Sequence, residues 1–139
     1  RKLVYSAYLH DIGKINVSKQ TLISEKKLNE DEWREIQKHP IDGADIIRHM
    51  NNLDDIAEIV LQHHEHYDGM GYPSDLKGTQ INRFARILAV ADTFDAMTSK
   101  RPYQDRRAIS DAFAEIRRCE GTQFDPEIAE EFIKTMDNI

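Results

Sequence analysis

The sequence contains little cysteine, proline or glycine: one cysteine, four prolines and six glycines in 139 residues. The single cysteine, Cys119, excludes an internal disulfide bond and fits a reducing compartment. No repeat or low-complexity tract is visible. Basic residues are also outnumbered, with 19 Lys and Arg against 25 Asp and Glu, and the net charge of −6 argues against non-specific nucleic-acid binding.

Long hydrophobic runs are missing as well. The longest, Ile87 to Ala91, is far too short to cross a bilayer, and no signal peptide opens the sequence. The composition of 40% hydrophobic and 32% charged residues is typical of a globular protein. We therefore expect residues 1–139 to form a single cytoplasmic domain, without membrane contact and without a large nucleic acid as partner.

Helix signals follow one another along the chain, whereas the alternation typical of strands never persists. One helix is expected to start at a capping box of Asn29 and Glu32, the next has Pro40 in its first turn, and a third starts at Asp54 and leads into His63. A fourth is expected from about Asn82 to Ser99. The last two are a helix capped by Ser110 that ends before Gly121, and a helix with Asp125 as cap and Pro126 in its first turn. The predicted fold class is all-α. The one long irregular stretch, Tyr67 to Ile81, has a length typical of functional loops.

Histidines and carboxylates stand at the ends of these expected helices. His10 and Asp11 follow the first segment, His39 lies at a helix junction, and His63 and His64 close another helix. Asp92 lies inside an otherwise apolar helix, where a buried carboxylate needs a cation or hydrogen-bond donors. Imidazole and carboxylate together suit iron, manganese or zinc, and the lack of thiolate ligands argues against a structural zinc site.

Adjacent helical residues point about 100° apart, so His63 and His64 are expected to serve two neighbouring ions, with Asp11 as a bridging carboxylate. Two ions about 3.5–4 Å apart are the arrangement that hydrolyses phosphate esters. Other interpretations stay open at this point, because a His–Asp pair is commonly a surface hydrogen-bonded pair and His39 could simply support the Pro40 cap. We assign His49 and His66 to such surface roles.

Five motifs decide between these interpretations. They are HDIGK (His10 to Lys14), His39-Pro40 with Gly43, HHEHYDGMGYP (His63 to Pro73), ADTFDAMTSKRPY (Ala91 to Tyr103) and GTQFDP (Gly121 to Pro126). In this order they strongly resemble the HD-GYP family, a branch of the HD metal-dependent phosphohydrolases. The resemblance covers nearly the whole chain, and the HHE…GYP block is its most specific part.

The resemblance implies an HD-domain-like helical bundle with one long GYP loop, hydrolysing cyclic di-GMP to linear pGpG, GMP or both. It also implies two or three divalent metal ions, iron or manganese, held by His10, Asp11, His39, His63, His64 and Asp92. Asp11 would be the bridging ligand, and Asp11 and Lys14 would form the catalytic pair, with Lys14 on the scissile phosphate. Substrate contacts would come from Lys14, Gly71, Tyr72, Pro73 and Arg101, and we expect Glu65 and Asp68 to orient the loop or the ligands.

The chain departs from the family pattern in two places. Family members carry an upstream helix with a further histidine ligand, but only nine residues precede His10. We therefore expect the first helices, and a regulatory sensor or receiver domain, to belong to a longer protein. Gln104 stands where the family commonly has a basic residue.

Two other functions are compatible with parts of this pattern. An HD-GYP module of weak or absent activity could signal by binding a cyclic dinucleotide, or a protein such as a diguanylate cyclase, through the GYP loop, although the intact motifs argue against lost activity. A plain HD nucleotidase or a di-iron oxygenase would lack the extended GYP block.

Overall fold

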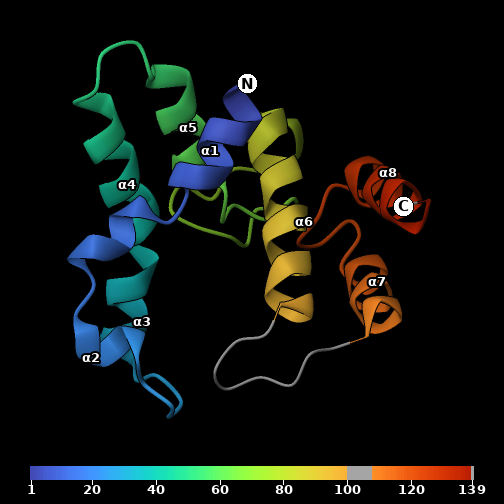
Figure 1. Ribbon diagram of the computed structural model, residues 1–139, viewed down its shortest axis with the longest axis horizontal. Coiled ribbons are helices and arrows are strands. Elements are labelled where there is room, and N and C mark those ends of the chain that lie inside the picture. Colours follow the sequence, from blue (N-terminus) through green and yellow to red (C-terminus); the bar gives the residue numbers. More distant parts are fainter. Residues whose placement is uncertain (100–107, 139) are drawn as a thin grey trace.

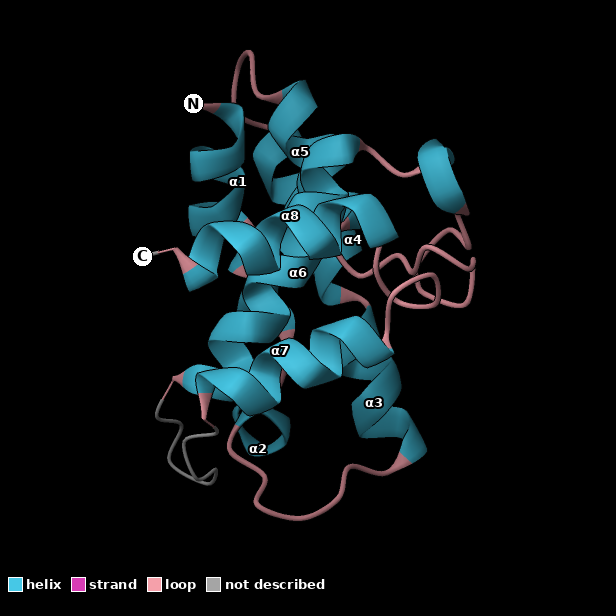
Figure 2. Cartoon of the chain, turned by 90° about the vertical axis from the view of Figure 1, so that its right-hand side faces the viewer, coloured by secondary structure: helices cyan, strands magenta, loops and turns pink. Residues whose placement is uncertain are grey.

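The structure is a computed structural model that describes residues 1–99 and 108–138. Its elements are α1 (Lys2–Leu9), η1 (Ile12–Asn16), α2 (Lys19–Leu22), α3 (Glu30–Gln37), α4 (His39–Arg48), α5 (Asp54–Gln62), η2 (Gly78–Gln80), α6 (Arg83–Thr98), α7 (Ile109–Arg118) and α8 (Pro126–Asp137). Within the described residues there is no strand, only one isolated bridge between Glu120 and Phe124 (Figure 2). The predicted all-α class is confirmed.

Most helices begin where their capping residues predict. Asn29 and Glu32 form a reciprocal capping box at α3, and Asn82 and Asp125 accept backbone hydrogen bonds at the starts of α6 and α8. The predicted cap at Ser110 is wrong: α7 begins one residue earlier, at Ile109, after Ala108, and has no side-chain cap. The apolar face of α7 buries Ala112, Phe113 and Ile116, so tertiary packing stabilises this helix in the absence of a side-chain cap.

Helices α4 and α5 form a hairpin against which α1 and η1 pack (Figure 1). The buried residues of this half are Ala44, Ile47, Ile56, Ala57 and Val60. The backbone of η1 lies so close to α4 that a Cβ on Gly13 would stand 1.9 Å from the carbonyl oxygen of His39. Only glycine allows this approach, which brings Asp11, next to η1, beside His39.

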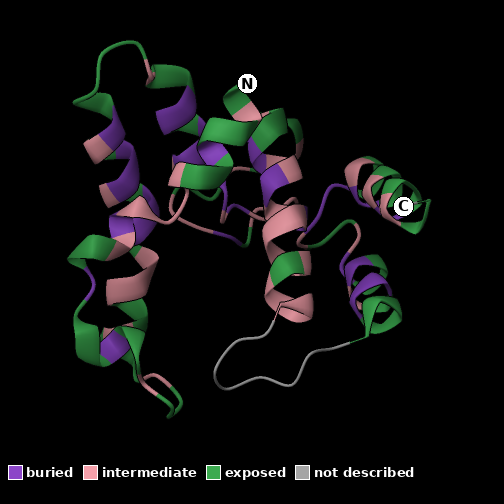
Figure 3. Ribbon diagram, viewed as in Figure 1, coloured by how far each residue is buried: buried purple, intermediate pink, exposed green. Residues whose placement is uncertain are grey.

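Helix α6 lies between this hairpin and the pair α7–α8, and contacts both (Figure 1). On one side, Ala85 and Leu88 of α6 pack with residues of α5 and the loop before α6. On the other side, Val90 of α6 joins Phe113, Ile116, Phe124, Ala129 and Ile133 in a second buried cluster. The burial pattern follows this arrangement, with buried residues facing the neighbouring helices (Figure 3).

The segment between α5 and α6 is irregular except for the three-residue helix η2. This agrees with the predicted loop at Tyr67–Ile81, which folds back close to the end of α5. Among the described residues, no helix is both long and apolar enough to cross a membrane.

Candidate metal centre

The ends of three helices bring four imidazoles together. His39 opens α4, His63 and His64 follow α5, and His10 follows α1. One ring nitrogen from each of His39, His63 and His64 lies within 4.8 Å of the other two, which is close enough for all three to reach one ion. His10 lies beside this group, with its ring centroid 5.3 Å from that of His63.

His63 and His64 lie side by side directly after α5. His63 keeps a right-handed helical backbone, with φ −68° and ψ −13°. The ring centroids of the two histidines are 4.1 Å apart and their ring planes are tilted by 44°. One nitrogen of each can reach a common ion with His39, and the use of the pair by two neighbouring ions stays a prediction.

Three of these histidines have a defined orientation. The Nδ1–H groups of His10, His39 and His63 donate to the carbonyl oxygens of Ala7, Ile36 and Val60, over 2.7, 2.6 and 2.6 Å. This tautomer leaves each Nε2 as a lone-pair donor, the arrangement found in metal-binding histidines.

The Nε2 atoms of His39 and His63 are buried and have no hydrogen-bond partner within residues 1–99 and 108–138. A buried polar atom left in this state is costly, and a coordinated cation would satisfy both nitrogens at once. The residues present therefore fit a metal ion.

Two carboxylates border the imidazoles. Asp11 lies between two histidines, with its Oδ2 3.5 Å from His10 Nε2 and its Oδ1 3.4 Å from His39 Nε2. Asp92 of α6 places its Oδ1 3.4 Å from His10 Nε2, and Lys14 Nζ lies 2.8 Å from Asp11 Oδ2. The structure thus brings together all six residues predicted as ligands, together with Lys14.

Burial sets the charge of the cluster. It lowers the pKa of His63 to about 4 and that of His64 to about 2, and it also lowers the pKa of His39. The contact between His10 and Asp92 acts in the opposite sense, raising the pKa of His10 and lowering that of Asp92 to about 2. At neutral pH the centre therefore offers the neutral imidazoles of His39, His63 and His64 beside the anionic carboxylate of Asp92, a donor set that suits a divalent cation.

The GYP loop, the irregular stretch Tyr67–Ile81 that contains Gly71, Tyr72 and Pro73, forms one wall of the centre. The ring of Tyr72 stacks on His64, with centroids 5.0 Å apart and planes 19° apart, and Tyr72 N donates to the His64 carbonyl oxygen. Burial raises the pKa of the Tyr72 hydroxyl to about 12. Pro73 follows through a cis peptide bond. A Cβ on Gly71 would stand 2.2 Å from His66 N, so this glycine is required by the loop's own backbone packing.

The predicted orienting role of Glu65 and Asp68 is confirmed. Glu65 is 3% exposed, and its two carboxylate oxygens accept the backbone N–H groups of Ser74 and Leu76 over 2.6 and 3.0 Å. Asp68 Oδ1 accepts the N–H of Met70 over 2.9 Å. Both carboxylates hold loop backbone rather than a histidine.

The remaining predicted residues fall outside the cluster. Arg101 and Gln104 lie beyond the described residues. His49 is exposed, and its Nδ1 donates to the Asp45 carbonyl, as expected of a surface histidine. His66 differs from its predicted surface role, because it is half-buried and lines a cavity next to His63 and His64.

That cavity, called the inner cavity below, has a volume of about 90 Å³. It is lined by His63, His64, Glu65, His66, Ala89, Asp92, Thr93 and Gln123. Thr93 and Gln123 were not predicted as site residues. Thr93 follows Asp92 in one motif and Gln123 lies in the motif GTQFDP, but the spacing of the two motifs along the chain does not show that Gln123 lies beside His64.

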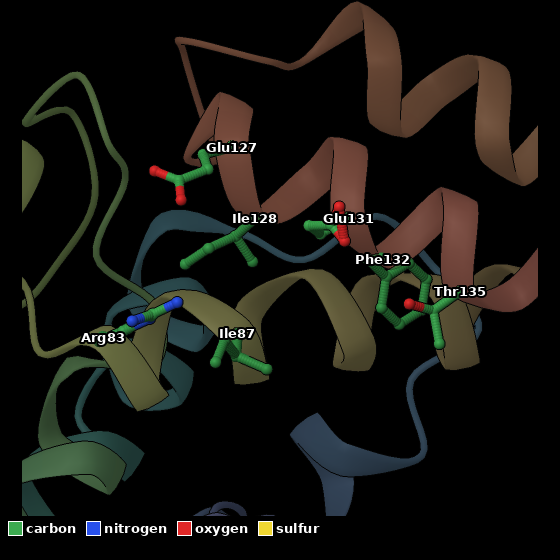
Figure 4. Close-up of a pocket in the computed structure, with 7 residues that line it drawn as sticks. All are labelled: Arg83, Ile87, Glu127, Ile128, Glu131, Phe132 and Thr135. Atoms are coloured by element: carbon green, nitrogen blue, oxygen red, sulfur yellow. The ribbon is translucent and has the colours of Figure 1, made fainter.

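A larger cavity of about 230 Å³ lies between α6 and α8 and shares no residue with the histidine cluster (Figure 4). Ile87 of α6 and Ile128 and Phe132 of α8 supply its apolar lining, and Arg83, Glu127, Glu131 and Thr135 complete it. No imidazole belongs to this lining, so the chemistry of the chain is expected at the histidine cluster.

Comparison with known proteins agrees with this geometry. The family model described as HD domain matches residues 1–128. The chain belongs to the HD domain family. The HD domain fold is also found in the crystal structure of a cyclic GMP-AMP specific phosphodiesterase of Vibrio cholerae, V-cGAP3, with a TM-score of 0.76 at 21% identity over 99% of this chain and 38% of that one.

Curated relatives of this HD domain carry phosphodiesterase names. A cyclic di-GMP phosphodiesterase of Thermotoga maritima is 40% identical over 96% of this chain. The cyclic di-GMP phosphodiesterase response regulator RpfG of Xanthomonas campestris is 39% identical over 96%, and a 3'3'-cGAMP-specific phosphodiesterase 3 of Vibrio cholerae is 38% identical over 88%. These matches confirm the resemblance to the HD-GYP branch. This chain spans 37%, 36% and 26% of the lengths of these three relatives.

Proposed function

We propose that this chain is the catalytic part of a phosphodiesterase that hydrolyses cyclic di-GMP to linear pGpG, GMP or both. The observation that carries the proposal is the convergence of four imidazoles and two carboxylates, with unpartnered Nε2 atoms on His39 and His63, in an HD domain. Relatives named as cyclic di-GMP phosphodiesterases match nearly the whole chain and support the substrate. We place the reaction in the cytoplasm, where a reducing environment suits the single cysteine.

The proposed ligands are His10, Asp11, His39, His63, His64 and Asp92, which would hold two or three iron or manganese ions. When bound, such ions lower the pKa of coordinated water to about 7 and stabilise charge on phosphate oxygens. Asp11 turns one oxygen to His10 and the other to His39, which suits a bridging ligand.

The other residues of the chain would position the substrate. The Lys14 ammonium lies 2.8 Å from Asp11, so a phosphate that approaches Asp11 meets a positive charge. Tyr72, flanked by Gly71 and Pro73 and held against His64 by stacking, would form a fixed wall for the dinucleotide. Arg101, which lies within the motif ADTFDAMTSKRPY, would bind the nucleotide and add positive charge for the phosphates.

Asp11→Ala provides the test. We expect hydrolysis of cyclic di-GMP with manganese, or with iron in the absence of air, to fall by about a thousandfold or more, equal to about 4 kcal/mol of lost transition-state stabilisation. Chromatography of the products measures the rate, and elemental analysis measures the metal. Asp45→Ala is the matched control, because Asp45 is exposed and its carboxylate pairs with Arg48 on the surface of α4. Full metal occupancy without hydrolysis of any cyclic dinucleotide would contradict the proposal.

The same assay separates related substrates. Cyclic di-GMP, 3'3'-cGAMP and nucleoside monophosphates should be compared under identical conditions, since relatives with the first two specificities match this chain at similar identity. We expect cyclic di-GMP to be the preferred substrate and the monophosphates to be inert.

A further inference from the structure

The inner cavity contains hydrogen-bonding groups that the proposed mechanism does not use. Its volume of about 90 Å³ is enough for several water molecules, since one water needs roughly 10–15 Å³ of such space. Its lining is largely polar and combines Asp92 and His64 of the proposed centre with Thr93 and Gln123. A space of this size and polarity favours bound water rather than an empty void.

Gln123 is carried by backbone that is fixed on both sides. Its own carbonyl oxygen accepts the N–H of Tyr67, and the carbonyl oxygen of Thr122 accepts the N–H of Asp68, over 3.2 and 2.9 Å. Phe124 is 1% exposed in the cluster between α6, α7 and α8. These contacts hold the start of the Gln123 side chain at a constant place beside the GYP loop.

The side chains facing this space have hydrogen-bonding capacity to spare. Within the part of the chain that the structure describes, no side-chain hydrogen bond involves the Gln123 amide, which offers two donors and one acceptor oxygen. The Thr93 hydroxyl donates to the Ala89 carbonyl over 2.8 Å, so its lone pairs remain for water. Asp92 accepts from water through any lone pair not directed at His10.

We propose that Gln123 is a positioning residue that holds water in the inner cavity, beside Asp92 and His64, for the hydrolysis. This inference rests on the proposed function. Hydrolysis consumes one water: its oxygen forms a bond to phosphorus, the ribose oxygen–phosphorus bond breaks, and a proton ends on the released ribose hydroxyl. Water bound between Gln123, Thr93 and Asp92 would hold the side chain of Asp92 in one orientation during each turnover.

Gln123→Met tests the kinetic role, because methionine has similar length but neither amide donors nor an acceptor oxygen. We expect kcat to fall by about tenfold, with KM, metal content and thermal stability unchanged. Thr93→Val should lower kcat as well, whereas Thr93→Ser, which keeps the hydroxyl, should have the wild-type kcat. In the double variant Thr93→Val with Gln123→Met, the fold-loss in kcat should be smaller than the product of the two single fold-losses. Gln20→Met, at an exposed position on α2, is the control.

High-resolution crystal structures of the metal-free wild type and of Gln123→Met give a readout that is independent of activity. Ordered water within hydrogen-bond distance of the Gln123 amide, lost in the variant, supports the inference. Unchanged water, unchanged kcat, or a kcat loss that follows metal content or stability overturns it. A wild type that hydrolyses no cyclic dinucleotide overturns the proposed function, while the two crystal structures still decide whether Gln123 holds the water.

Discussion

At the residue scale, histidines that follow helix ends share one local geometry. His10, His39, His49 and His63 each turn Nδ1 toward a carbonyl oxygen of the preceding helical turn, over 2.6–2.7 Å. The last carbonyls of a helix lack backbone partners, so this bond can be expected from the sequence position alone. His49 makes it too, yet lies exposed and apart from the others. The bond prepares a ligand, but only the tertiary fold makes a metal centre.

His63 makes the stability of the metal-free chain depend on pH. Its pKa is about 4 in the folded state because burial opposes protonation, whereas the unfolded side chain titrates near 6.5. Between pH 6.5 and pH 4, His63 is protonated in the unfolded state but stays neutral in the folded state. We expect His63 to remove about 3 kcal/mol from the free energy of unfolding across this range, with no further loss below it. Urea titrations followed by circular dichroism measure the loss.

His63→Gln removes this titrating group and should reduce the loss of stability between pH 6.5 and 4 by about 3 kcal/mol, whereas His39 and His64, whose pKa values are also lowered by burial, keep their share of it. His10 acts in the opposite sense, because its pKa is raised in the folded state and its stabilisation is lost as the pH rises. The comparison of wild type with His63→Gln cancels that contribution. His49→Gln, at an exposed helix end, should keep the wild-type slope. If His63→Gln and the wild type lost stability in parallel, burial of a neutral His63 would be contradicted.

At the scale of elements, the GYP loop is held by the Glu65 carboxylate and by two backbone hydrogen bonds to the segment before α8. Glu65 holds Ser74 and Leu76, and the loop's Tyr67 and Asp68 donate to the segment before α8. The orienting role of Glu65 could be predicted from its place in the motif. Its partners could not, because nine to eleven residues of irregular chain separate them from it.

Glu65→Gln should loosen this loop. An amide keeps one acceptor oxygen but turns an NH₂ group toward the second backbone N–H, so one of the two partly buried hydrogen bonds is lost. We expect the free energy of unfolding to drop by about 1–3 kcal/mol, and amide hydrogen exchange at Ser74 and Leu76 to accelerate by about tenfold or more. Glu131→Gln, on the exposed face of α8, should change neither measurement. Unaltered exchange at both amides would show that the carboxylate does not hold the loop.

At the scale of the whole molecule, α6 connects the centre to both halves of the core. It packs Ala85 and Leu88 on one side, Val90 on the other, and contributes Asp92 to the histidine cluster. The sequence could predict the helix and its cap, because those signals are local. It could not predict the ion pair between Arg86 and Asp125, because the two residues are far apart along the chain. The local role of Asp125 as the cap of α8 also gives no reason to expect a second partner.

This pair is largely buried, with the side chains of Arg86 and Asp125 15% and 7% exposed, and Arg86 Nε also donates to the Ile81 carbonyl oxygen. Asp125→Asn keeps the cap oxygen but leaves the guanidinium unpaired, so we expect a loss of about 3 kcal/mol in the free energy of unfolding. Arg86→Met should cost a similar amount, because it strands the carboxylate. In a double-mutant cycle by urea unfolding, the free energy of unfolding lost in the double variant should be smaller than the sum of the two single losses by about 1 kcal/mol or more. The same cycle on the exposed pair Lys134 and Glu130 should give about 0.5 kcal/mol or less. Strict additivity at Arg86 and Asp125 would mean that α6 and α8 are held together by apolar packing alone.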